Sequence, residues 1–148
     1  MISKREMTAR ILEAKAAKGL SWASLAQASG LSEVYTVSAC LGENALPGEA
    51  AAKVAALLDL DSEIAAALTG FANKGEAAPT IPKEPLQYRL LEILYVYGPT
   101  MKALIEEKFG PGIMSAIDFT MDIERVADAK GDRVKITMNG KFLGYRTW

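Results

Sequence analysis

Three prolines in residues 75–85 divide the sequence into two parts that have different hydrophobic periods. They are Pro79, Pro82 and Pro85. A proline inside a helix removes a backbone hydrogen bond and clashes with the preceding turn, and it pushes the residue before it towards extended conformations. Residues 75–85 therefore predict an extended linker between an N-terminal domain, 1–74, and a C-terminal domain, 86–148.

The N-terminal part contains residues that are typical of the starts and ends of short helices. Serine or aspartate precedes several apolar stretches, as at a helix N-cap, and glycine follows several of them, as at a helix C-terminus. The predicted helices are Thr8–Lys18, Trp22–Ser29, a helix capped by Ser32 that runs to Leu41, one that Pro47 and Glu49 open and that runs to Leu58, and one from Asp61 or Ser62 to about Leu68. Five helices of this length indicate a small bundle.

The C-terminal part begins with a helical pattern and then changes to a period of two. Leu86–Tyr97 predicts a helix that Gly98-Pro99 ends, and Thr100–Phe109 predicts a second one. From Ile117 onwards apolar and polar residues alternate, as in a half-buried strand. Asn139-Gly140 predicts a two-residue hairpin turn because both positions tolerate positive φ. The fold class is therefore α+β: a repressor-like helical bundle followed by a helix-plus-β-hairpin domain.

Part of the bundle has the spacing of a helix-turn-helix. Leu25-Ala26 and Gly30-Leu31 place a small residue and a glycine where that motif requires them. The second helix, however, contains no Arg, Lys, Asn or Gln, which are the side chains that read bases and bind phosphates. Glu33 would also repel the DNA backbone. A DNA-binding regulator is thus an alternative that the sequence disfavours.

The composition limits the possible chemistry. The net charge is −1, so no global field attracts nucleic acid or an anionic membrane. The sequence contains no histidine, which excludes His-based triads and most zinc sites. Acid–base chemistry must then depend on Asp, Glu, Lys, Tyr, Ser or a substrate, and we expect no metal site.

The location of the protein is predicted from what the chain lacks. No apolar run reaches the ~18 residues of a membrane span, and the start lacks the features of a secretory signal. Cys40 is the only cysteine and lies in an apolar helical pattern, so no intrachain disulfide can form. We expect a cytoplasmic protein with Cys40 buried.

Arg89 and Glu92 lie three residues apart on a predicted helix, so their side chains are neighbours. On spacing alone they could be an exposed ion pair worth ~0.2–0.5 kcal/mol. Ser115 could equally end a turn before the strand. The residues alone leave both interpretations open.

Three elements around these residues carry a resemblance to a known family. They are Tyr88–Glu92, with the pattern Tyr-Arg-x-x-Glu, then Lys102–Gly110, which ends in Lys-Phe-Gly, and Gly112–Phe119, with the sequence Gly-Ile-Met-Ser-Ala-Ile-Asp-Phe. With these elements the chain resembles the cyanases, also called cyanate hydratases or cyanate lyases. The resemblance is strongest over residues 85–141 and extends through the N-terminal bundle. Two positions depart from the family pattern: Pro111 stands where an aspartate is common, and Gly144 where many members have proline.

The resemblance implies an activity and a set of catalytic residues. Members of the family break down cyanate in a bicarbonate-dependent reaction that yields ammonia and carbon dioxide through carbamate. The family's catalytic arginine, glutamate and serine correspond to Arg89, Glu92 and Ser115 in this chain. Bicarbonate is a second substrate, and no metal or organic cofactor is implied. The family also implies a homodecamer of five interlocked dimers, with sites between subunits. An inactive oligomeric scaffold with the same fold is a further alternative.

The role of Glu92 has two interpretations at this point. An ionised carboxylate beside two anionic substrates is repulsive. Either Arg89 holds the carboxylate, or Glu92 is protonated and passes a proton while the adduct of the two substrates breaks down.

Overall fold

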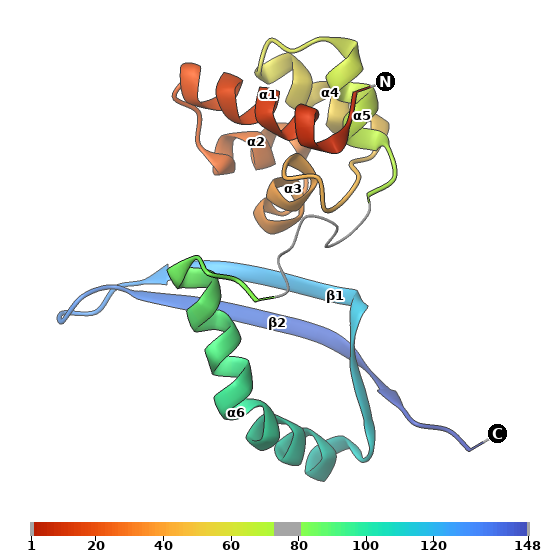
Figure 1. The fold of residues 1–148 in the computed structure, drawn as a ribbon, viewed down its shortest axis with the longest axis vertical. Helices are drawn as coiled ribbons and strands as arrows, with labels where there is room; N and C mark the ends of the chain where they lie inside the picture. The colour runs from red at the N-terminus through yellow and green to blue at the C-terminus, as the bar shows by residue number, and fades with distance from the viewer. Residues whose placement is uncertain (1, 73–80, 148) are drawn as a thin grey trace. The chain divides into compact units, whose positions relative to one another are not determined.

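The computed structural model describes residues 2–72 and 81–147 and has the predicted α+β architecture. Five short helices are followed by one long helix and a two-stranded antiparallel sheet (Figure 1). The chain divides into two compact units, Met1–Glu76 and Ala77–Trp148, which we call the N-terminal and the C-terminal unit. Residues 75–80 of the predicted linker lie outside the described residues, and 81–84 are not helical.

The helices of the N-terminal unit follow the predicted order. They are α1 (Lys4–Ala17), α2 (Trp22–Ser29), α3 (Glu33–Cys40), α4 (Gly48–Leu57) and α5 (Ser62–Thr69). Ser21 and Ser32 cap the helices that follow them, as expected, and Asp61 is the N-cap of α5, which begins at Ser62. The start of α1 was predicted too late, at Thr8, because Ser3 is its N-cap and accepts the Glu6 N–H at 3.1 Å.

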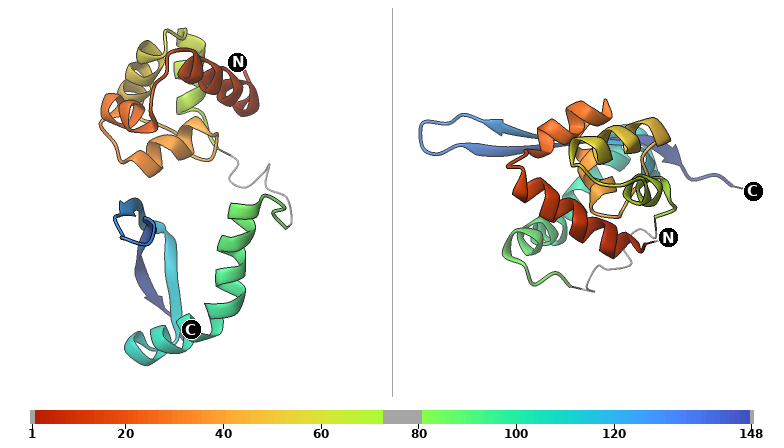
Figure 2. Two further views of the ribbon diagram at one scale, coloured as in Figure 1. Left: turned by 90° about the vertical axis from the view of Figure 1, so that its left-hand side faces the viewer. Right: turned by 90° about the horizontal axis from the view of Figure 1, so that it is seen from above.

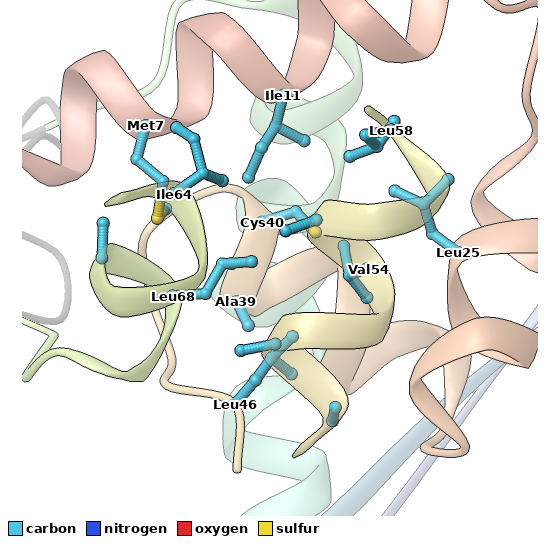
Figure 3. Close-up of a cluster of buried hydrophobic side chains, with 14 residues drawn as sticks. Met7, Ile11, Leu25, Ala39, Cys40, Leu46, Val54, Leu58, Ile64 and Leu68 are labelled. Atoms are coloured by element: carbon cyan, nitrogen blue, oxygen red, sulfur yellow. The ribbon is translucent and has the colours of Figure 1, made fainter. Parts of the chain in front are cut away.

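The core of the N-terminal unit is built from aliphatic side chains of all five helices. Figure 3 shows Cys40 inside this core, with Val54 and Ala39 among its neighbours. Cys40 is fully buried, and burial raises the pKa of its thiol to about 11. The expectation that Cys40 is buried is therefore confirmed.

One continuous helix, α6 (Pro85–Phe109), stands where two were predicted. Glu84 caps it by accepting the N–H groups of Leu86 and Gln87 at 3.0 and 2.8 Å, and these bonds lower the pKa of its carboxyl group. Pro99 lies inside the helix rather than ending it. A proline can remain in a helix by bending it, and α6 changes direction partway along its length (Figures 1 and 2).

The hairpin consists of β1 (Gly112–Val126) and β2 (Arg133–Gly144). The predicted turn at Asn139-Gly140 is wrong, because both residues lie inside β2 and pair with Thr120 and Phe119. The chain turns instead between Val126 and Arg133, where Gly131 has a φ of 121°. The pairing of the two long strands overrides the local preference of Asn-Gly.

The C-terminal unit has almost no core of its own. Among residues 81–147, Ser115 is the one buried side chain. Large apolar side chains on α6 and on both strands are exposed, including Tyr95, Val96, Ile117, Val134 and Ile136. Searched over the described residues, no helix is both long and apolar enough to cross a membrane.

Candidate functional site

Helix α6 holds Arg89 and Glu92 on adjacent turns. The Nη1 of Arg89 donates to Oε2 of Glu92 at 2.8 Å, so the predicted neighbours form an ion pair. Both side chains are exposed within one copy of the chain. The Arg89 guanidinium also lies 5.8 Å from the centre of the Tyr88 ring, within the range of a cation–π contact.

Most of the Arg89 guanidinium is available to a ligand. Among the described residues Glu92 is its only hydrogen-bond partner, and the bond uses Nη1 alone. Within the part of the chain that the structure describes, the N–H groups of Nη2 and Nε have no acceptor, and a planar fork of this kind suits the oxygens of a carboxylate-like anion. The pair can therefore bind an anion while Glu92 fixes the position of the arginine.

Ser115 lies on β1 in a different local environment. Its side chain is 8% exposed. Its Oγ accepts the N–H groups of Ile117 and Asp118 at 3.1 and 3.0 Å. A serine hydroxyl has two acceptor positions and one proton to donate. No acceptor for that proton is found among the described residues, so the hydroxyl can donate to a ligand.

The hydrogen bonds of Ser115 occur because β1 departs from regular pairing. The register runs from Met114 opposite Phe142 to Phe119 opposite Gly140. Residues 115–118 of β1 therefore face only Lys141 of β2. This bulge turns the backbone N–H groups of Ile117 and Asp118 towards the Ser115 hydroxyl, and it leaves Ile117 96% exposed. Across the bulge, Lys141 Nζ lies 3.8 Å from Asp118 Oδ2.

The structure thus brings together two of the three predicted site residues. Arg89 and Glu92 are in direct contact, whereas no hydrogen bond or ion pair in the described part of the chain joins Ser115 to either of them. All three belong to the C-terminal unit.

A shallow pocket lies between α6 and the start of β1 within this unit. It is lined by apolar residues such as Leu94, Met101 and Ile113, together with the ion-paired Lys102 and Glu106. Neither Arg89 nor Ser115 lines it. Across the residues that the structure describes, no group of three acidic, histidine or cysteine side chains is placed to bind a metal ion.

The structure contains the two helices and the glycine turn that the helix-turn-helix spacing predicts. Gly30 has a left-handed conformation, with a φ of 72°, between α2 and α3. Ser29 and Thr36 share a buried hydrogen bond of 2.8 Å across the turn. Thr36 is fully buried, so its hydroxyl contributes to the packing of the two helices.

Sequence comparison covers both units of the chain. A family model described as "Cyanate hydratase, N-terminal" matches residues 4–70, and one described as "Cyanate lyase C-terminal domain" matches residues 79–147.

Individual relatives match over nearly their whole length. The cyanate hydratase of Pseudomonas putida is 53% identical over 99% of this chain and 100% of the relative, and that of a Synechococcus species is 53% identical over 99% and 97%. A crystal structure of cyanase from T. urticae has 33% identity and a TM-score of 0.83, and the match covers 93% of this chain and 96% of that one. The chain therefore belongs to the cyanate hydratase, or cyanate lyase, family.

Proposed function

We propose that this member of the family decomposes cyanate with bicarbonate as the second substrate, and that Arg89, Glu92 and Ser115 form its active site. The observation that carries the assignment of the site is the hydroxyl of Ser115. It is buried, it accepts two backbone N–H groups, and among the described residues its own proton has no acceptor. A donor fixed in this way stabilises negative charge without having to reorganise.

Cyanate and bicarbonate are both anions, so joining them concentrates negative charge. An oxygen of bicarbonate attacks the carbon of cyanate, and the cyanate nitrogen takes up protons. The bond between the attacking oxygen and the bicarbonate carbon then breaks, so the bicarbonate carbon leaves as carbon dioxide and the oxygen stays on the cyanate carbon as part of carbamate. Carbamate takes up a proton, and its C–N bond breaks to give ammonia and a second carbon dioxide. The balance is one cyanate, one bicarbonate and two protons to one ammonia and two carbon dioxide molecules. Every step moves protons and electron pairs only, so no step requires a redox cofactor, and the proposal includes no metal or organic cofactor.

Arg89 supplies the positive charge that the adduct requires. The guanidinium of an arginine is a cation with planar N–H groups, and this geometry suits the planar oxygens of the adduct. The ion pair at 2.8 Å supports the first interpretation of Glu92, in which the carboxylate and Arg89 hold each other. In this account Glu92 positions the arginine, and Ser115 donates to the charge that develops on the adduct.

The active enzyme is proposed to be an oligomer, a decamer of five interlocked dimers. The apolar surface of the C-terminal unit supports assembly, because Tyr95, Ile117 and Val134 are each more than 70% exposed in one copy. Exposed apolar surface on this scale is typical of an interface. Assembly would also supply copies of Arg89 or Ser115 from neighbouring subunits to one site. A cytoplasmic location stays a prediction.

The experiment that tests the function measures ammonia released from cyanate by the purified protein in carbon-dioxide-depleted buffer. We expect ammonia only when bicarbonate is added. Ammonia at the same rate without bicarbonate would contradict the second substrate. No ammonia from a protein shown to be folded and oligomeric would favour the inactive scaffold. The DNA-binding alternative has no support from the relatives, which are cyanate hydratases along the whole chain.

A further inference from the structure

We infer that Gly140 is a positioning residue for Ser115: the absence of a side chain at Gly140 lets the β1 bulge close against β2 and hold the Ser115 hydroxyl in place. The inference rests on the proposed role of Ser115 in the reaction. Gly140 belongs to the Asn-Gly pair that the sequence assigned to a turn, so a different reason must explain the glycine.

The reason is space rather than backbone conformation. Gly140 does not have a positive φ, so its conformation is open to other residues. A Cβ atom placed on Gly140, however, would lie 2.4 Å from the carbonyl oxygen of Ser115 and 2.6 Å from Cγ of Met114. Cβ atoms in proteins essentially never lie closer than 3.0 Å to a non-bonded heavy atom of this kind. Of the two contacts, the one with the backbone oxygen of Ser115 cannot be relieved by rotating a side chain.

The geometry connects this contact to the hydroxyl. Gly140 pairs with Phe119, the first residue after the bulge, and lies against Ser115 and Met114 at its other end. A methyl group on Gly140 would have to move the Ser115 carbonyl by about 0.6 Å, the difference between 2.4 Å and 3.0 Å. The carbonyl belongs to the peptide that leads into the turn whose N–H groups bind Ser115 Oγ. Moving it displaces the hydroxyl from the position in which it donates.

The test is the Gly140→Ala variant, assayed as the full-length assembled protein. A displacement of this size at a catalytic group is expected to lower kcat/KM for cyanate by roughly 10- to 100-fold. Gly144→Ala is the matched control, because it lies on the same strand and its Cβ would meet no atom closer than 3.7 Å. We expect Gly144→Ala to keep kcat/KM within about threefold of the wild type.

A double-mutant cycle separates positioning from general damage. If Gly140 acts through the Ser115 hydroxyl, adding Gly140→Ala to Ser115→Ala should change kcat/KM by less than about threefold, because the group that it positions is already gone. If the glycine matters only for stability, the two losses multiply. Multiplying losses, or a Gly140→Ala variant as active as Gly144→Ala, would overturn the inference. Full activity of Ser115→Ala would instead overturn the proposed role of Ser115.

A second pair of variants keeps the test usable if Gly140→Ala does not assemble. Met114→Ala removes the Cγ atom that a Cβ on Gly140 would meet at 2.6 Å, and leaves the contacts with the Ser115 carbonyl oxygen at 2.4 Å and with Phe119 Cδ2 at 3.3 Å. Comparing Met114→Ala with Met114→Ala/Gly140→Ala then measures the effect of the added methyl group without the Met114 Cγ contact, and the shorter of the two remaining contacts is the one with the Ser115 carbonyl oxygen. We expect the same loss of roughly 10- to 100-fold between these two proteins, and equal activities would count against the inference.

Discussion

Replacing Ser115 by alanine removes a hydroxyl that has two separate roles in this structure. It accepts the N–H groups of Ile117 and Asp118, and it can donate its own proton to the substrates. The first role contributes to the stability of the bulge, and the second contributes to catalysis. Because the roles use different atoms of the hydroxyl group, their losses can be measured separately.

The loss of stability follows from the two N–H groups that lose their acceptor. A buried donor left unsatisfied costs about 1–3 kcal/mol. Both hydrogen bonds are only partly buried, so water can replace some of the lost acceptor, and we expect the lower part of this range for Ser115→Ala. The midpoint of thermal unfolding of the assembled protein measures this loss.

The loss of activity should be larger. Removing one donor that stabilises a developing anion costs about 2.7–4 kcal/mol, or 10²–10³ in kcat. The assay is ammonia release at saturating bicarbonate, performed well below the unfolding midpoint. Ser115→Thr is the control because it keeps the hydroxyl. A folded Ser115→Ala protein with kcat within about threefold of the wild type would refute the assignment of Ser115.

Three further predictions concern Arg89, Glu92 and Cys40. Arg89→Lys keeps the charge but loses the planar fork, so we expect kcat/KM to fall by roughly 10- to 100-fold in the ammonia assay, and near-normal turnover would exclude recognition by two N–H groups. Glu92→Gln still offers an oxygen to Arg89 at the position of the 2.8 Å contact, so activity should stay within about tenfold, whereas a loss beyond about 10² would indicate essential proton transfer. Because burial raises the pKa of the Cys40 thiol to about 11, a thiol reagent at pH 8 should modify Cys40 only after denaturant is added, and fast labelling of the native protein would contradict the buried core position.

Where a helix in the N-terminal unit begins or ends is set largely by local signals, and these can be read from the sequence. Ser21 and Ser32 each bind an N–H group of the first turn that follows, and Gly30 takes the left-handed conformation that ends α2. Such contacts span only a few residues, so neighbouring residue types predict them well. Ser3 likewise binds an N–H group in the first turn of α1. The residues that follow Ser3 are mostly polar, so the hydrophobic pattern did not indicate that the helix starts there.

The wrong predictions in the C-terminal unit concern places where contacts between distant residues, or the continuation of a helix, override a local preference. Pro99 costs α6 a hydrogen bond, but the helix bends and continues instead of stopping. Asn139-Gly140 has the residues of a turn, yet both pair with β1, and the register of the two strands decides where the chain reverses. Gly140 is then explained by the close approach of Ser115 across the sheet.

The candidate site also contains one contact that depends on neighbouring residues and one that depends on residues far apart in the sequence. The contact of Arg89 with Glu92 follows from their spacing on one helix, and the sequence predicts it. The surroundings of Ser115 do not follow from spacing, because they depend on a bulge that forms only when β1 pairs with β2. The catalytic assignment of Arg89, Glu92 and Ser115 stays a prediction until the variants are measured.

The carbon balance of the reaction tests the central claim most directly. The purified protein is given unlabelled cyanate and ¹³C-bicarbonate in carbon-dioxide-depleted buffer, and released ammonia, ¹²CO₂ and ¹³CO₂ are followed together. The account predicts that each ammonia is accompanied by one ¹²CO₂ from cyanate and one ¹³CO₂ from bicarbonate, with ¹³CO₂ forming faster than bicarbonate dehydrates without the protein. Ammonia accompanied by ¹²CO₂ alone would mean that water, and not bicarbonate, attacks cyanate, and would contradict the account.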